Sequence, residues 1–146
     1  MKTVKVIYWS GTGNTEQMAQ AVAQGIEAKG ASADVKTVSE VQAAELADDK
    51  AFALGCPAMG AEELEETEME PFMCALEGSL SGKQVVLFGS YGWGDESWMR
   101  SWEERVKAAG ATVVTGTGIA AMDAPDDAAT EQCKQAGSAL AELAGE

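Results

Sequence analysis

Residues 4–15 read VKVIYWSGTGNT and place a strand, a glycine-rich turn and the start of a helix in one continuous run. The first half is almost entirely apolar, which is typical of a strand buried on both faces of a parallel sheet. Two glycines then permit a tight turn with positive φ, and the backbone N–H groups at the start of a helix face an anion. Because residues 10–15 contain no Lys or Arg, this stretch predicts a phosphate-binding turn made of uncharged groups.

Two common phosphate-binding loops do not fit residues 10–15. A Walker loop requires a Gly-Lys-Ser/Thr sequence, which does not follow here. The dinucleotide-binding fingerprint requires a third glycine at the position where this chain has Glu16. An ordinary glycine-rich turn, capped by Asn14 or Thr15, is the alternative interpretation of this segment taken alone.

The alternation of strand and helix continues along the chain. Strands are expected at residues 4–9, 33–38, 50–56, 83–91 and 111–119, and helices at 14–29, around 70–77, 97–109 and 126–144. This order predicts a doubly wound α/β fold, in which helices cover both faces of a parallel sheet. The faces expected to be buried are Thr15, Met18, Val22 and Ile26 in the first helix, Trp98, Trp102 and Val106 in the third, and Cys133, Ala136, Leu140 and Leu143 in the last.

The composition limits the functions open to this chain. Its 146 residues fit a single domain, expected to span 1–146, and carry 24 Asp+Glu against 10 Lys+Arg, a net charge of −14. This charge argues against nucleic acid and anionic membrane surfaces and favours partners with a basic docking face. The absence of histidine excludes imidazole general bases, histidine-containing catalytic triads and histidine metal sites.

The three cysteines, Cys56, Cys74 and Cys133, are widely spaced and form no CxxC pair. Iron–sulfur and structural zinc sites need closer clusters, usually with a fourth ligand, so neither is expected. An odd number of separated cysteines also argues against a disulfide framework. Because no signal segment or membrane-spanning run is found, a cytoplasmic location is expected.

Ligands of doubly wound folds bind beyond the carboxyl ends of the strands, which here gives the loops 10–15, 57–68 and 92–96. Trp93 lies between two glycines in the third loop, where an indole has little local core to pack into. Met59, in the second loop, carries a thioether that packs well on aromatic faces. Mutual packing of these two side chains is one interpretation. Together with the phosphate-binding turn, they favour a flat heteroaromatic ring held between them, and thus flavin mononucleotide (FMN).

Three segments, SGTGNT at 10–15, GCPAMGAEELEE at 55–66 and GSYGWGD at 89–95, resemble the short-chain flavodoxins of obligate anaerobic bacteria. The resemblance covers essentially the whole chain. The predicted last strand runs without a break to the turn at 122–125, and so lacks the insertion of long-chain flavodoxins. The resemblance implies a flavodoxin-like, five-stranded parallel sheet in the order 2-1-3-4-5, which is the known strand order of flavodoxins.

The same resemblance implies an electron-transport flavoprotein rather than an enzyme. Its non-covalently bound FMN would cycle between oxidised, semiquinone and hydroquinone states, so that the protein serves as a low-potential one-electron redox carrier. The implied partners are ferredoxin-type oxidoreductases, hydrogenases and flavin reductases with basic docking faces. The implied oligomeric state is a monomer.

The resemblance also implies roles for individual residues. Those assigned to the FMN phosphate, together with the amides of their loop, are Ser10, Thr12, Asn14 and Thr15. Trp93 and Met59 flank the ring, the Gly60 carbonyl accepts from the reduced N5, and Glu62 accepts from N3–H. The complete implied cofactor-binding set is Ser10, Gly11, Thr12, Gly13, Asn14, Thr15, Pro57, Ala58, Met59, Gly60, Ala61, Glu62, Ser90, Tyr91, Gly92, Trp93 and Gly94. Of these, Pro57 and Ala61 depart from the residues found in relatives.

Proteins of other functional classes would show different sequence features. An FMN-dependent NAD(P)H:quinone reductase shares the fold but usually needs basic residues for a second phosphate, and Lys83 and Arg100 are the basic residues near these loops in sequence. A receiver module needs an acidic pair after the first strand and an Asp after the third, where this chain has residues YWS (8–10) and GCP (55–57). A non-redox FMN-binding protein would form no stable semiquinone.

The run from Glu62 to Glu70 contains six Glu in nine positions and lies beside the expected flavin loop. It is interpreted both as a solvated face and as a source of negative potential at the flavin. One charge at ~10 Å, with an effective dielectric of roughly 60, raises the energy of an anionic hydroquinone by about 0.5 kcal/mol, or ~20 mV.

Converting Glu63, Glu65 and Glu66 to Gln is therefore expected to raise the semiquinone/hydroquinone potential by a few tens of millivolts, by the same Coulomb estimate of roughly 20 mV per charge. The oxidised/semiquinone potential should barely move, because neither of its forms is anionic at the ring. A redox titration measures both couples, and equal shifts in the two would contradict the assignment.

Overall fold

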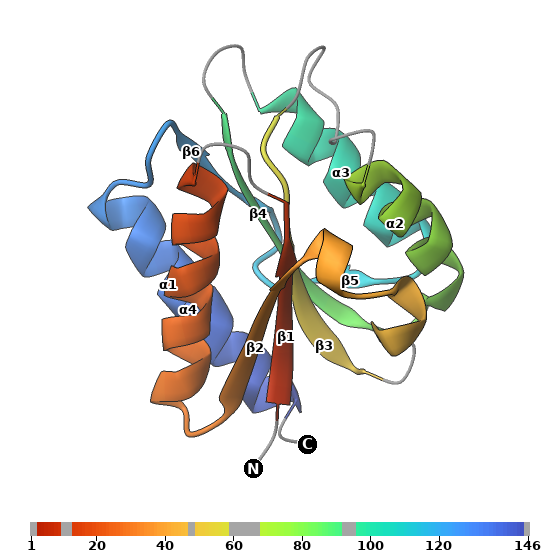
Figure 1. Cartoon of the computed structure of the whole chain (residues 1–146), viewed down its shortest axis with the longest axis horizontal. Coiled ribbons are helices and arrows are strands. Elements are labelled where there is room, and N and C mark those ends of the chain that lie inside the picture. The colour runs from red at the N-terminus through yellow and green to blue at the C-terminus, as the bar shows by residue number, and fades with distance from the viewer. Residues whose placement is uncertain (1–2, 10–12, 47–48, 59–67, 92–95, 145–146) are drawn as a thin grey trace.

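The computed structural model describes residues 3–9, 13–46, 49–58, 68–91 and 96–144. Its strands are β1 (Thr3–Tyr8), β2 (Ser32–Thr37), β3 (Ala51–Gly55), β4 (Gln84–Tyr91), β5 (Thr112–Val113) and β6 (Ile119–Met122). Its α-helices are α1 (Asn14–Ala28), α2 (Met69–Leu76), α3 (Ser97–Ala108) and α4 (Asp127–Ala144) (Figure 1). Short 3-10 helices, η1 (Val38–Glu40), η2 (Ala43–Leu46) and η3 (Glu77–Ser79), had no sequence prediction.

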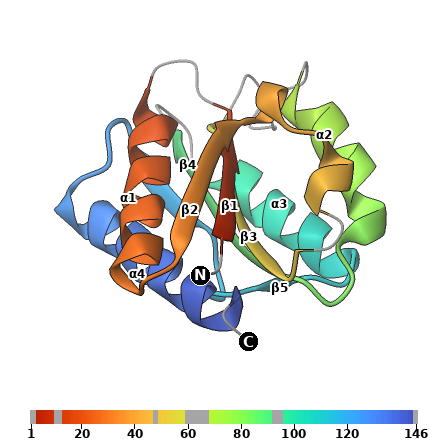
Figure 2. The same ribbon diagram turned by 60° about the horizontal axis from the view of Figure 1, so that its bottom comes forward.

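All strand pairs are parallel, and their order is β2-β1-β3-β4-β5, with β6 also paired to β4. Helices α1 and α4 cover one face of the sheet, whereas α2 and α3 cover the other (Figure 2). This confirms the predicted doubly wound sheet and its order. The observed elements begin and end within about one residue of the predicted bounds everywhere except at the fifth strand, an ordinary boundary difference.

The fifth strand was predicted as one run, 111–119, and this is wrong. Two short strands share that position: β5 pairs with Gln84 and Val85, and β6 pairs with residues 88–91 of the same neighbour. Between them Gly116 has φ +83°, which breaks the extended conformation. The restart is held by α3, because the buried Glu103 carboxylate accepts the Gly118 N–H and pairs with Arg100 at 3.1 Å.

Two apolar layers flank the sheet, as the helix patterns predicted. Met18, Val22 and Ile26 of α1 are completely buried against one face, and the indoles of Trp98 and Trp102 are 1% exposed on the other. Leu143 was predicted to be buried but is 37% exposed. At that end of α4 the buried positions are Leu140 and Ala141, whereas Leu143 shares the helix face of Ala136 but lies in the last turn, one residue before the helix ends.

Helices α1 and α4 pack closely through two glycines. A Cβ at Gly25 would lie 1.9 Å from the Lys134 carbonyl oxygen, and one at Gly137 would lie 2.0 Å from that of Val22. The Ser138 hydroxyl also donates to the Gly25 carbonyl at 3.0 Å. This contact fixes α4 against the helix that begins at the predicted phosphate turn.

The three cysteines are free thiols, with Cys56 and Cys133 buried and Cys74 exposed. Burial raises the pKa of Cys133 to about 12. Within the described ranges no group of three or more Cys, Asp or Glu side chains is placed to hold a metal ion. No helix in that part of the chain is long and apolar enough to cross a membrane.

Helices α2 and α3 are joined by one arginine. Arg105 donates from Nη1 and Nη2 to the two carboxylate oxygens of Glu70, at 2.8 and 2.6 Å, and from Nε to Glu77 at 3.0 Å. Hydrogen bonding from this guanidinium lowers the pKa of Glu70. A carboxyl group with a lowered folded pKa stabilises the fold above its unfolded pKa, and that contribution is lost as the pH falls through the folded pKa.

Arg105→Met is expected to lower the free energy of unfolding at pH 7 by on the order of 1 kcal/mol, a modest value because the pair is partly exposed. The difference from wild type should shrink below about pH 4, as Glu70 becomes protonated. Urea unfolding at pH 7 and below about pH 4 measures this difference in the free energy of unfolding. Lys107→Met, an exposed position on the same helix, is the control, and an equal loss in both variants would contradict the role of the pair.

Candidate functional site

The carboxyl ends of β1, β3 and β4 meet at one edge of the sheet, at the top of Figure 1. The predicted site loops leave the sheet at this edge. Seven of the predicted site residues are described: Gly13, Asn14, Thr15, Pro57, Ala58, Ser90 and Tyr91. The others, Ser10, Gly11, Thr12, Met59, Gly60, Ala61, Glu62, Gly92, Trp93 and Gly94, lie outside the described residues.

Helix α1 begins at this edge. Gly13 precedes it with φ +93°, a left-handed conformation that favours glycine, and its carbonyl accepts the Gln17 N–H at 3.0 Å. A Cβ at Gly13 would meet nothing within 4 Å, so the backbone angle rather than the available space calls for glycine. The positive end of the helix dipole and its first free N–H groups suit an anion such as a phosphate.

A buried pair of hydroxyls joins the start of α1 to the end of β4, just before the third loop. Thr15, 1% exposed, accepts the Ser90 N–H at its Oγ1 at 3.3 Å, and its Oγ1 lies 3.4 Å from the Ser90 hydroxyl oxygen. The Ser90 carbonyl in turn accepts the Ala58 N–H at 3.0 Å, which brings in the second loop. The start of α1, the end of β4 and the start of the second loop are therefore linked by hydrogen bonds.

Trp9 joins the end of β1 to the second loop, a contact that its assignment to the strand alone did not predict. Its backbone N–H donates to the Gly55 carbonyl, and its indole Nε1 donates to Glu68 Oε1, both at 3.0 Å. Glu68 is the residue before α2 and belongs to the acidic run. One carboxylate of that run is thus fixed next to the end of β1.

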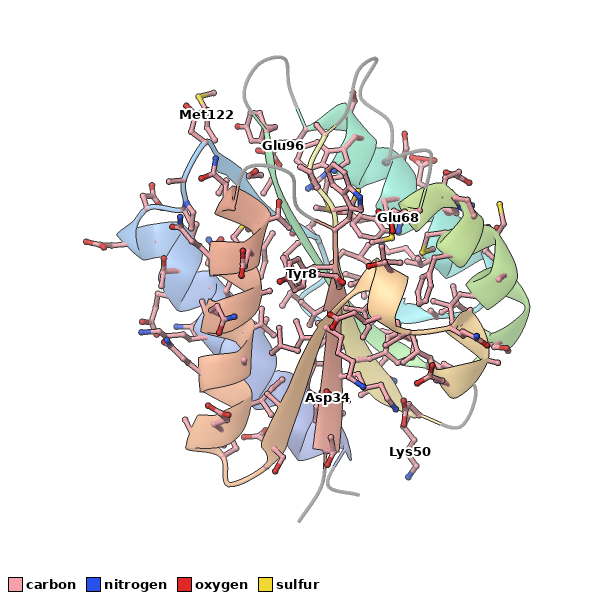
Figure 3. The ribbon with its side chains drawn as sticks, viewed as in Figure 1. Tyr8, Asp34, Lys50, Glu68, Glu96 and Met122 are labelled. Carbon is pink, nitrogen blue, oxygen red and sulfur yellow. The ribbon has the colours of Figure 1, made fainter. Side chains whose placement is uncertain are left out.

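The end of β4 is held from two sides. The Tyr91 carbonyl accepts the Asp123 N–H at 2.7 Å, and the Tyr91 ring lies 5.6 Å from that of Trp98, centroid to centroid. Asp123 has φ +58°, and its neighbour Met122 is 57% exposed. In Figure 3 Met122 and Glu96 both lie at this end of the molecule. Of this corner, Tyr91 belongs to the predicted cofactor-binding set, whereas Trp98, Met122 and Asp123 do not.

The local field at the end of β1 is negative. The pKa of Tyr8 is raised, chiefly by burial and then by the carboxylates of Glu16 and Glu40. Tyr8 therefore remains a neutral phenol at pH 7. An anion held at the start of α1 by the helix dipole and uncharged groups would be bound against this field.

The comparisons with known proteins agree with this geometry. The sequence model of the flavodoxin family matches residues 6–137. The chain belongs to the flavodoxin family. It is 46% identical to a flavodoxin from Clostridium beijerinckii over 96% of this chain and 100% of that one, and 45% identical to a flavodoxin from Megasphaera elsdenii over 94% and 98% of the two chains. The solution structure of two-electron reduced Megasphaera elsdenii flavodoxin superposes with a TM-score of 0.86, at 44% identity over 95% of this chain and 98% of that chain.

Flavodoxins are electron-transport proteins that bind FMN and exchange electrons with redox partners; they are not enzymes. The described part of this flavodoxin fits that cofactor. A helix N-terminus preceded by a left-handed glycine suits a phosphate, and buried hydroxyls add neutral hydrogen-bonding groups. FMN supplies the reversible uptake of electrons, and the chain supplies binding, orientation and the surrounding charge.

The Thr15–Ser90 contact predicts a stability effect that is independent of cofactor. Thr15→Val is expected to lower the free energy of unfolding of the apoprotein by about 1–2 kcal/mol, because the buried Ser90 N–H loses its acceptor. Thr15→Ser keeps the hydroxyl and should lose much less. Urea unfolding of the three proteins checks this, and a Val variant as stable as wild type would show that the contact carries no such energy.

Proposed function

We propose that this flavodoxin carries single electrons at low potential, on non-covalently bound FMN, as a monomer and as one domain spanning residues 1–146. The observation that supports this most directly is the linkage of the three loop ends through Thr15, Ser90 and Ala58 at the edge where α1 begins. A phosphate bound at that N-terminus places the rest of FMN along the same edge. Its ring would then lie between Met59 and Trp93, the residues that sequence assigns to it.

The charge distribution supports partners with a basic docking face. Acidic residues at the carboxyl edge and the helix starts include Glu16, Glu40, Glu68, Glu96, Asp126 and Asp127, whereas four lysines, Lys5, Lys29, Lys50 and Lys83, stand at the opposite end. Of the basic residues at the carboxyl edge, Arg100 is paired with Glu96 and Glu103, and Lys36 with Asp34. Figure 3 shows Glu68 and Glu96 far from Lys50. At the lysine end two carboxylates are paired with lysines, in the Lys5–Asp49 contact at 2.6 Å and the Lys29–Glu142 contact at 2.8 Å.

This separation of charge steers a basic partner toward the edge that holds the cofactor. We propose ferredoxin-type oxidoreductases, hydrogenases and flavin reductases as the class of partner. The three free thiols fit a reducing compartment, and we place the protein in the cytoplasm.

Stepwise reduction of the FMN-loaded protein tests the function. Two separated one-electron couples, and electron transfer to a basic partner that slows as salt rises, are expected. A single two-electron step, or a rate that does not depend on salt, would contradict the proposal.

The phosphate assignment has its own test. Thr12→Ala is expected to weaken FMN binding by roughly 1–3 kcal/mol, the usual cost of losing a hydrogen bond to a charged group, and to leave riboflavin binding nearly unchanged. Titration with the two flavins measures the difference. Equal losses for both ligands would mean that this threonine does not act on the phosphate.

A further inference from the structure

Trp98 connects helix α3 to the start of the second site loop. Its indole is 1% exposed, and Nε1 donates to the carbonyl oxygen of Cys56 at 3.1 Å. Trp98 is the second residue of α3, and Cys56 directly follows β3. The hydrogen bond is therefore buried at the point where the chain leaves the sheet toward Met59.

The backbone that leads into this loop is fixed on both sides. The Cys56 N–H donates to the Phe88 carbonyl and the Ala58 N–H to the Ser90 carbonyl, both at 3.0 Å. Between them Pro57 has a restricted φ and no N–H to donate. Strand β4 thus holds the two amides, and Trp98 holds the carbonyl that lies between them.

The same carbonyl lies at the end of the regular β3–β4 pairing, whose last pair is Gly55 and Phe88. If the parallel ladder continued by one step, the Ser90 N–H would donate to the Cys56 carbonyl. The Ser90 N–H instead donates to Thr15 Oγ1 at 3.3 Å, and the Cys56 carbonyl accepts from Trp98. Side chains of α1 and α3 therefore bond backbone groups at this point.

Close packing leaves little freedom for this carbonyl. A Cβ at position 89 would lie 2.1 Å from the Cys56 oxygen and 3.2 Å from Cζ2 of Trp98, so only glycine fits there. The Trp98 ring also contacts the Tyr91 ring, the last described residue before the third site loop. One indole thus contacts the origins of both loops to which the flavin ring is assigned.

We propose that Trp98 is a positioning residue of the FMN site. Its indole N–H fixes the direction of the Cys56 carbonyl and thereby the direction in which the loop carrying Met59 and Gly60 leaves β3. The inference rests on the proposed placement of the ring at that loop and requires no contact between Trp98 and FMN.

The chain offers a matched control in Trp102. It lies one turn further along α3 and is equally buried, at 1% exposed. Within the part of the chain that the structure describes, its Nε1 has no hydrogen-bond partner. Replacing either tryptophan by β-(3-benzothienyl)alanine substitutes sulfur for N–H and keeps the ring shape, so that the two variants differ in whether a hydrogen bond is lost.

Three measurements separate positioning from a merely structural role: FMN release on dilution of the FMN-loaded protein, the first one-electron reduction potential, and urea unfolding. The variant at Trp98 is expected to release FMN with a dissociation constant about tenfold higher, the equivalent of ~1.4 kcal/mol. Its oxidised/semiquinone potential should become more negative by up to ~59 mV, which corresponds to a tenfold difference in FMN affinity between the two oxidation states. The variant at Trp102 should stay within about twofold of wild type in FMN binding.

Trp98→Phe and Trp102→Phe form a second matched pair built from natural amino acids, and the same contrast is expected. A loss of stability at Trp98 with unchanged FMN binding and unchanged potential would overturn the proposal, as would equal effects at the two positions. If the wild-type protein itself bound no FMN, the proposed function would fail together with this inference. If wild type binds FMN and the variants at Trp98 match it, the inference alone fails.

Discussion

The regular pairing of β3 with β4 ends at Gly55 and Phe88. Directly beyond these residues, side chains of α1 and α3 form hydrogen bonds with backbone groups of the same two chain segments. A buried N–H or C=O without a partner costs about 1–3 kcal/mol, so a parallel sheet cannot end inside the protein without such partners. Thr15 bonds the Ser90 amide, and Trp98 bonds the Cys56 carbonyl. The strands can then separate into loops at a defined place, which is the condition for a cofactor site at this edge.

An anion site on a chain of net charge −14 depends on short-range forces. The amides at the start of α1 would contact an anion directly, whereas the effect of a distant carboxylate is screened over about 8 Å at physiological salt. The local backbone dipoles therefore prevail at contact distance. The overall charge acts at longer range, on how an approaching protein is oriented.

The order of strands and helices could be predicted from sequence because apolar runs and 3.6-residue patterns are local properties. The phosphate turn stays a prediction on the same local basis, since its glycines and hydroxyls are consecutive and the structure describes only its last three residues, 13–15. The contacts that hold the site together could not. Trp9 and Glu68 are 59 residues apart, and Trp98 and Cys56 are 42 apart, so nothing local indicates that they meet. The break in the fifth strand was missed because the β-branched residues at its two ends, 112–114 and Ile119, favour strand, whereas the chain already turns from residue 114.

Because of that break, two short strands, β5 and β6, take the place of one long strand beside β4. β5 pairs with the start of β4 and β6 with its end, while Thr115, Gly116 and Thr117 between them are exposed. Glu103 and Arg100 of α3 bond Gly118, directly before β6. The register of β6 against β4 therefore does not depend on the length of the segment that precedes Gly118. Loop closure grows only slowly more costly with loop length. The connection is thus a site where a flavodoxin chain can lengthen during evolution while its sheet and cofactor edge remain the same.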